Sequence, residues 1–175
     1  MRLVYLIGEP GAGKSTLVRH LLAGLDAEAV SKPFAHTLYR VNGQIHIAQL
    51  GADHDTYPGT DRLSMGVLPK AVEFVAESTI PIIIAEGDRL ATTKFLDSAA
   101  KTREVTLVLC HADRALLEQR RAIRGSNQND TWLRGRQTKV HNLWTRWTGE
   151  KLRIRMSAPP DLLALQVRGL LDIDE

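Results

Sequence analysis

Short runs of apolar residues alternate along the chain with longer stretches in which apolar residues recur every three or four positions. A short run bounded by glycine or polar residues is typical of a strand buried on both faces, whereas the longer period is typical of a helix with one buried side. A β-rich stretch at residues 34–50 contains Asn42-Gly43, a dipeptide that favours a tight hairpin turn. The short runs predict strands at residues 3–7, 81–85, 104–110 and 152–156.

Helices are expected between these strands, with boundaries marked by glycine, proline and charged residues. The last of them carries proline in its first turn, where a backbone N–H has no helical partner to lose. The predicted helices cover residues 14–24, 65–78, 92–101, 112–124, 130–147 and 159–171. Because strands alternate with helices, we expect an α/β fold with a parallel sheet covered on both faces.

The composition is that of an ordinary globular protein, with 43% apolar and 25% charged residues. The length of 175 residues fits one domain that buries about two-thirds of its unfolded surface. No apolar stretch is long enough to span a bilayer or to form a signal-peptide core. Cys110 is the single cysteine and follows an apolar run, so it is expected to be a buried, inert thiol. These features predict a cytoplasmic protein without a membrane partner.

Charge is distributed unevenly, although the net charge is only +3. Residues 114–155 hold eleven Lys and Arg but three acidic residues, so this basic segment carries about +8 and the rest of the chain about −5. Such a segment is typical of proteins that bind nucleotide phosphates or a nucleic-acid backbone. A solvated helix face would account for the same charges, and the sequence leaves both interpretations open.

Residues 8–15, GEPGAGKS, match the pattern G-x-x-x-x-G-K-[ST] at every fixed position, between a predicted strand and a predicted helix. Glycines let successive backbone N–H groups turn toward phosphate oxygens, and the N-terminus of the helix adds a partial positive charge. We expect Lys14 to reach the β- and γ-phosphates of a nucleoside triphosphate and the Ser15 hydroxyl to ligate Mg²⁺. The loop residues expected to bind the nucleotide are Gly8, Gly11, Ala12, Gly13, Lys14, Ser15 and Thr16.

Two signatures of a GTPase are missing, because no D-x-x-G segment occurs and residues 138–141 lack the aspartate that reads guanine. Along almost its whole length the chain instead resembles the small P-loop kinases of the nucleotide and nucleoside kinase superfamily. This resemblance implies ATP and Mg²⁺ as cofactors and a three-layer α/β P-loop fold, with a five-stranded, mostly parallel sheet in the order 2-3-1-4-5. It also implies a single kinase domain over residues 1–175, with an acceptor region at about residues 34–66 and a helical lid at about residues 124–140.

The predicted strand at residues 81–85 leads into an acidic turn, Glu86-Gly87-Asp88-Arg89. A carboxylate at the C-terminal end of a parallel strand beside the phosphate loop lies where α/β proteins bind ligands. Deoxyribonucleoside kinases place Glu and Arg there, which Glu86 and Arg89 resemble, and thymidylate kinases place Asp-Arg, which Asp88-Arg89 resembles. The resemblance implies that one carboxylate is the general base or anchors the acceptor, while the other, with Asp88 a candidate, holds Mg²⁺ through water. A strand that merely ends in a solvated acidic turn is the alternative.

Residues 54–65 form a polar loop where small kinases bind their acceptor. Thr60, Asp61 and Ser64 offer hydrogen-bonding groups for a base or sugar edge, and Tyr57 offers a stacking face. Asp61 is a second candidate for the general base, or it caps the following helix. Because a phosphate acceptor is already ionised whereas a hydroxyl benefits from a base, the acids favour a hydroxyl acceptor.

The expected lid combines arginines with amides and Trp132. Arginine in a closing lid neutralises charge on the transferring phosphoryl group and helps to exclude water. The resemblance gives Arg124 this catalytic role and places Arg120 at the bound nucleotide. The amides and Trp132 also suit hydrogen bonding to, or stacking on, an unpaired base.

Three segments together resemble phage P-loop kinases that phosphorylate 5-hydroxymethyluracil in DNA: GTDRLSM at residues 59–65, AEGDRL at 85–90 and RGSNQNDTWLRGRQTKVHNL at 124–143. The resemblance implies DNA with a modified base as the partner, the hydroxymethyl group as the acceptor, and the host cytoplasm as the location. Two alternatives stay open. One is a free nucleoside or nucleoside-monophosphate kinase resembling thymidylate kinase, and the other is a nucleotide-gated DNA-binding module without phosphoryl transfer.

Overall fold

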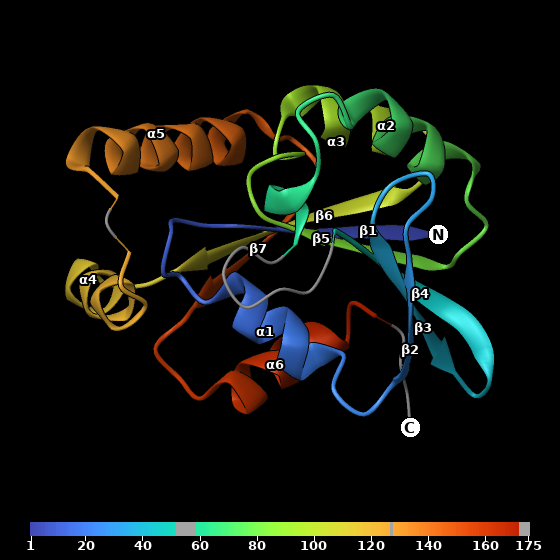
Figure 1. Ribbon diagram of the computed structural model, residues 1–175, viewed down its shortest axis with the longest axis horizontal. Helices are drawn as coiled ribbons and strands as arrows, with labels where there is room; N and C mark the ends of the chain where they lie inside the picture. Colours follow the sequence, from blue (N-terminus) through green and yellow to red (C-terminus); the bar gives the residue numbers. More distant parts are fainter. Residues whose placement is uncertain (52–58, 127, 172–175) are drawn as a thin grey trace.

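The computed structural model describes residues 1–51, 59–126 and 128–171. A seven-stranded mixed sheet forms its centre, in the order β2-β3-β4-β5-β1-β6-β7 (Figure 1). β4, β5, β1, β6 and β7 run parallel to one another, whereas β2 and β3 extend the sheet with antiparallel pairs. The strands are β1 (Arg2–Ile7), β2 (Asp26–Val30), β3 (His36–Val41), β4 (Gln44–Leu50), β5 (Ile82–Glu86), β6 (Glu104–His111) and β7 (Glu150–Arg155).

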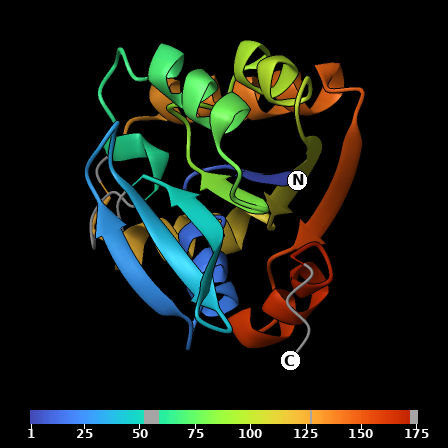
Figure 2. The same cartoon turned by 90° about the vertical axis from the view of Figure 1, so that its right-hand side faces the viewer.

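Helices cover both faces of the sheet, with α2, α3 and α5 on one face and α1 and α6 on the other (Figures 1 and 2). α4 lies beyond the carboxyl ends of the parallel strands, beside the start of α5 (Figure 1). The α-helices are α1 (Lys14–Leu21), α2 (Leu68–Glu77), α3 (Thr93–Ala99), α4 (Arg114–Ile123), α5 (Asp130–Arg146) and α6 (Pro160–Arg168), and η1 (Thr60–Arg62) is a 3₁₀ turn. No helix of the described residues is long and apolar enough to cross a membrane.

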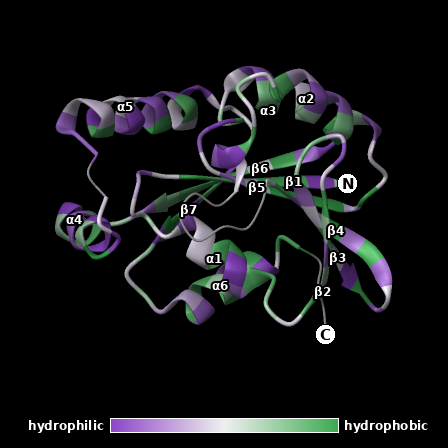
Figure 3. Ribbon diagram, in the orientation of Figure 1, coloured by the Kyte–Doolittle hydropathy of each residue, from purple (hydrophilic) through white to green (hydrophobic). Residues whose placement is uncertain are grey.

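The hydrophobic core consists of two clusters, one on each face of the sheet. Successive residues of β1 enter opposite clusters, because side chains alternate across a strand: Leu3 and Tyr5 pack on the side of α3 and α5, and Val4 and Leu6 on the side of α1 and α6. Figure 3 shows the apolar residues gathered in the central strands and the polar ones on the outer helices. Burial on both faces explains the unbroken apolar runs of the sequence.

The α/β class with helices on both faces is confirmed, but the five-stranded sheet in the order 2-3-1-4-5 is wrong because the sheet has seven strands. The hairpin at Asn42-Gly43 is confirmed, with φ of 51° and 77° at the two turn residues. β2 has no counterpart in the prediction, because it is an edge strand whose residues are exposed or half-buried and whose sequence lacks an apolar run. All six predicted helices are also shorter than expected, most of all α2, which begins at Leu68, and α6, which ends at Arg168.

The parallel register brings the functional segments together. β1 lies between β5 and β6, and Leu6 pairs with Glu86 across the first of these contacts. The phosphate loop that follows β1 therefore begins beside the acidic turn that follows β5. This edge of the sheet is where ligands bind in open α/β sheets.

Candidate active site

The phosphate loop, residues 8–15, has the backbone conformations that a phosphate cradle needs. Gly11 and Gly13 have φ of 87° and 92°, in the left-handed region that strains any residue with a Cβ. Gly8 lies against β6, where a Cβ would meet the carbonyl oxygen of Cys110 at 2.3 Å. Lys14 Nζ donates to the Gly8 carbonyl oxygen at 2.9 Å, so the ammonium group lies over the loop.

The N-terminus of α1 completes the cradle. The helix begins at Lys14, and its first internal hydrogen bond runs from the Leu17 N–H to the Gly13 carbonyl oxygen at 2.9 Å. The N–H groups of the first turn, including those of Ser15 and Thr16, have no partner inside the helix. These donors and the helix dipole fit the phosphate groups of a nucleotide.

Ser15 and Glu86 form the centre of the site. Ser15 Oγ donates to Glu86 Oε1 at 2.7 Å, and the Glu86 side chain is buried, with only 2% of its surface exposed. Burial raises the pKa of the Glu86 carboxyl, while the Lys14 ammonium and the Ser15 hydrogen bond partly offset the rise. A hydroxyl and a carboxylate are oxygen donors of the kind that Mg²⁺ prefers, so this pair fits a magnesium ion held together with phosphate oxygens.

Two buried hydrogen bonds and one close approach hold the acidic turn against β1 and the loop at residues 59–60. Thr60 Oγ1 donates to the Glu86 carbonyl oxygen at 2.9 Å, and the Tyr5 hydroxyl donates to the Gly87 carbonyl oxygen at 3.2 Å. Gly59 lies so near that a Cβ would meet the Glu86 carboxylate oxygen at 2.4 Å. Burial raises the pKa of the Tyr5 hydroxyl, so it stays a neutral donor. Sequence reasoning missed Tyr5, whose only signal is a hydroxyl within an otherwise aliphatic strand.

Asp61, in η1, is hydrogen-bonded to the acidic turn and does not cap a helix. Its Oδ1 accepts the Asp88 backbone N–H at 2.6 Å, and its carbonyl oxygen accepts Arg89 Nη2 at 3.3 Å. α2 begins only at Leu68, so the alternative of a helix cap is wrong. Asp61 keeps solvent access, yet desolvation by surrounding protein atoms raises the pKa of its carboxyl against the opposing effect of Lys14.

Asp88 points to α5. Its carboxylate forms ion pairs with Arg136 and with Lys139, the latter at 2.9 Å, and Lys139 Nζ also donates to the Asp88 carbonyl oxygen at 2.8 Å. Desolvation lowers the pKa of the Lys139 ammonium, with Arg136 adding to this effect. Arg136 in turn lies over the Trp132 ring at 4.9 Å. Arg136 and Lys139 both belong to the basic segment of residues 114–155, but the sequence did not indicate that Asp88 is their partner.

Three arginines of α4 and its C-terminus lie near the phosphate loop to different degrees. Arg120 Nη1 donates to the Ala12 carbonyl oxygen at 3.4 Å, and Arg121 Nη1 donates to the Pro10 carbonyl oxygen at 3.1 Å. Arg124 follows α4 and is exposed. Its charge offsets part of the rise that burial causes in the pKa of Glu86. Arg120 and Arg121 thus contact the loop directly, whereas Arg124 acts from a greater distance.

The structure therefore joins most of the predicted site residues in one network. The contacts above bring five of these residues together beside the phosphate loop: Lys14, Ser15, Glu86, Asp61 and Arg89. In residues 1–51, 59–126 and 128–171, no group of three or more His, Cys, Asp and Glu side chains could hold a metal ion by itself. The predicted stacking residue Tyr57 lies outside the described residues.

Comparisons with known proteins identify the family of the chain and a protein of similar fold. Residues 1–169 match the family model described as P-loop Nucleotide Kinase3. An unliganded sugar kinase from Janibacter sp. HTCC2649 has a similar fold, with a TM-score of 0.54 and 14% identity over 99% of this chain and 95% of that chain. A shikimate kinase from Acinetobacter baumannii in complex with shikimate gives a TM-score of 0.49 and 17% identity over 96% and 91% of the two chains. No curated protein gives a significant match.

Proposed function

The chain belongs to the P-loop Nucleotide Kinase3 family and is a kinase, and we propose that it phosphorylates a hydroxyl of a nucleoside-type acceptor, the hydroxymethyl group of 5-hydroxymethyluracil in phage DNA. The phosphoryl-transfer part of the proposal rests on the 2.7 Å hydrogen bond from Ser15 to the buried Glu86, directly beside the phosphate loop, and the choice of DNA rests on the basic segment of residues 114–155. Family membership favours the two kinase hypotheses over a DNA-binding module without phosphoryl transfer.

On the donor side, Mg²⁺-bound ATP supplies the phosphoryl group and the metal neutralises part of its charge. Lys14 leaves the Gly8 carbonyl oxygen and binds the β- and γ-phosphates, while the loop amides hold the phosphate oxygens. Ser15 and Glu86 are the residues that would hold the Mg²⁺, in place of the role predicted for Asp88. Asp88 instead fixes α5 through its two cations.

On the acceptor side, Asp61 is the proposed general base. It is accessible, its Oδ1 is oriented by the Asp88 N–H, and its raised pKa brings it closer to the operating pH. As the acceptor oxygen bonds to the γ-phosphorus and the bond to the bridging oxygen of ADP breaks, Asp61 takes the proton of the acceptor hydroxyl. Glu86 is less suited to this step because it is buried and already accepts the Ser15 hydroxyl.

The lid proposed for residues 124–140 begins at Arg124, the residue that follows α4, and includes the first part of α5 from Asp130 to Val140. The start of α5 lies beyond the carboxyl ends of the strands (Figure 1). Arg124 belongs to this segment and is exposed, so it would bring positive charge to the transferring phosphoryl group, whereas Arg136 is already paired with Asp88. The basic segment that includes this lid supports DNA rather than a free nucleotide as the acceptor.

The test offers the protein γ-labelled ATP and Mg²⁺ with DNA containing 5-hydroxymethyluracil, unmodified DNA of the same sequence, and free nucleosides and nucleoside monophosphates. We expect label only in the modified DNA. Label in a free nucleoside or monophosphate would show a metabolic kinase and refute the DNA acceptor. Lys14→Ala is the matched negative control, because transfer that survives it does not come from this phosphate loop.

A further inference from the structure

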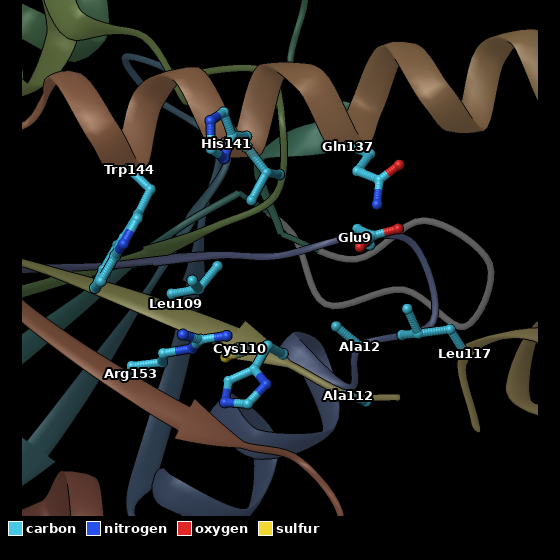
Figure 4. A pocket seen from close by; sticks show the side chains of 12 residues that line it. Glu9, Ala12, Leu109, Cys110, Ala112, Leu117, Gln137, His141, Trp144 and Arg153 are labelled. Atoms are coloured by element: carbon cyan, nitrogen blue, oxygen red, sulfur yellow. The ribbon is translucent and has the colours of Figure 1, made fainter. Parts of the chain in front are cut away.

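A cavity of about 390 Å³ opens beside the phosphate loop on the α5 side of the sheet. Its walls come from the loop, from β6 and β7, and from α4 and α5. In Figure 4, Gln137 extends from α5 toward Glu9 of the loop, and Trp144 of the same helix reaches down toward Arg153 of β7. Leu109 lies between Trp144 and Arg153. The cavity thus offers an aromatic ring, an apolar floor and hydrogen-bonding groups, and apart from Ala12 of the loop the site described above uses none of them.

A row of cations leads along the edge of this cavity. Lys151, Arg153 and Arg155 are all exposed and alternate along β7, the edge strand of the sheet, and Arg155 Nη2 forms an ion pair with Asp113 Oδ2 at 2.8 Å. Ile154 between them packs into the cluster on the α1 and α6 side, so these three residues, the β7 row, project on the α5 side. Arg153 lines the cavity, and Lys151 Nζ lies 5.2 Å from the centre of the Trp144 ring.

We propose that the cavity and the β7 row form a binding subsite for a nucleic-acid strand with unpaired bases. One base next to the acceptor enters the cavity beside Trp144, and the flanking phosphates lie along the row. The inference rests on the proposed function, because it requires an acceptor within a polynucleotide. A free nucleoside or monophosphate has no second base to fill the cavity.

The dimensions agree with such a strand. Residues on one face of a β-strand repeat about every 6.7 Å, so the β7 row spans about 13 Å. This length corresponds to roughly four nucleotides at the spacing of about 3.4 Å found along one strand of a DNA duplex. The carboxyl end of β7 is three inter-strand spacings, about 14 Å, from that of β5, which carries the acidic turn. A strand whose acceptor base lies at the acidic turn therefore reaches the cavity within a few nucleotides.

The chemistry of the lining also favours a base over a phosphate inside the cavity. Glu9 places a carboxylate at one end, which repels an anion, whereas Gln137 offers an amide donor and acceptor. Desolvation lowers the pKa of His111 in the lining, with Arg153 and Arg155 adding to this effect, so its imidazole is neutral and can both donate and accept. The cavity suits a heterocycle with mixed donors and acceptors, and the exposed row suits its phosphates.

One experiment tests the subsite with kinetics of transfer to single-stranded DNA containing 5-hydroxymethyluracil. It compares the wild type, a Lys151→Gln/Arg153→Gln variant and a Lys70→Gln/Lys101→Gln control, which loses the same charge at exposed positions elsewhere. We expect the β7-row variant to raise the KM for DNA with kcat and the KM for ATP unchanged. Each phosphate contact contributes about 0.7 to the slope of log KM against log salt, so the loss of two contacts should lower this slope by about 1.4. The control should match the wild type.

A second arm leaves the protein unchanged and places one abasic nucleotide at successive positions beside the acceptor. One position should raise the KM for DNA by about 5- to 150-fold, as expected for a lost stacking contact. The subsite is overturned if DNA is phosphorylated but neither the variant nor any abasic position changes its KM. It is also overturned if the variant raises the KM for ATP instead, because the cavity then holds the donor nucleotide. Label that enters only free nucleotides overturns the proposed acceptor itself, together with the subsite.

Discussion

The hydrogen bond from Ser15 to Glu86 links the stability of the protein to its active site, and Ser15→Ala tests it directly. The variant removes the donor from a carboxylate that is almost fully buried. We expect the nucleotide-free variant to be less stable than the wild type, because a buried carboxylate loses part of its compensation for desolvation. The same variant loses a proposed magnesium ligand, so phosphoryl transfer should fall as well.

The size of the effect follows from the geometry. A hydrogen bond to a charged group contributes about 1.5 to 3 kcal/mol to stability, and the ionised Glu86 carboxylate that accepts this bond at 2.7 Å is such a group. For a chain of 175 residues, each kcal/mol changes the Tm by roughly 2 to 4 °C. Ser15→Ala should therefore lower the Tm by about 3 to 12 °C. In a Glu86→Gln background the bond is neutral and contributes about 0.5 to 1.5 kcal/mol, so the same change should cost roughly 1 to 6 °C.

The dependence on pH gives an independent check. Burial already raises the pKa of Glu86, and the Ser15 bond lowers it in part, so Ser15→Ala raises this pKa further. When the folded-state pKa of a carboxyl group is raised, the protein loses stability as the pH rises through that pKa. The difference between variant and wild type should therefore be largest at pH 8 and shrink as the pH falls.

Thermal unfolding without nucleotide, followed by circular dichroism at pH 8 and at pH 5, measures these differences for the four proteins of the double-mutant cycle. If Ser15→Ala costs the same with and without the Glu86→Gln substitution, the reasoning is refuted, because Ser15 then does not compensate the Glu86 charge. A loss that grows toward low pH would refute it as well.

Four further predictions concern other residues of the site and the core. Lys14→Ala should abolish label transfer from ATP while leaving circular dichroism unchanged, and any measurable turnover would contradict the role of the loop. Glu86→Gln should cut turnover by about 10- to 100-fold and raise the Mg²⁺ concentration for half-maximal rate, whereas an unchanged Mg²⁺ titration would remove it from the metal site. Asp61→Asn should cut turnover by about 10²- to 10⁴-fold. In the wild type the rate should fall as the pH drops through the raised Asp61 pKa, since the base must be ionised, and if the variant keeps this acid limb, another group is the base. Arg103→Met should destabilise the protein by about 3 kcal/mol or more in urea unfolding, because Arg103 donates to three backbone carbonyl groups of residues 75–80 at 2.6 to 2.9 Å, and an unchanged midpoint would contradict this.

The helices and central strands were predictable because each leaves a local pattern in the chain. β1 and β5 are buried on both faces, so their apolar runs are unbroken, and the glycines of the phosphate loop mark a turn that few other residues can form. The hairpin at Asn42-Gly43 was predictable for the same reason, since its turn depends on two adjacent residues. Edge strand β2 leaves no such pattern, because its side chains are mostly solvated and its pairing partner β3 determines its conformation.

By itself, the sequence determined the phosphate loop, the α/β class and the candidate carboxylates, because glycine spacing and apolar periodicity are local properties. Only the tertiary structure decided how these carboxylates are paired: Glu86 with Ser15, Asp88 with Arg136 and Lys139, and Asp61 with the Asp88 N–H. The partners are separated in sequence by 27 to 71 residues where a hydrogen bond joins them, and a carboxylate in a sequence carries no mark of the partner that it will meet. Their division of work arises from parallel strands whose carboxyl ends meet at one edge of the sheet, because only there do burial and neighbouring charge act on each group differently.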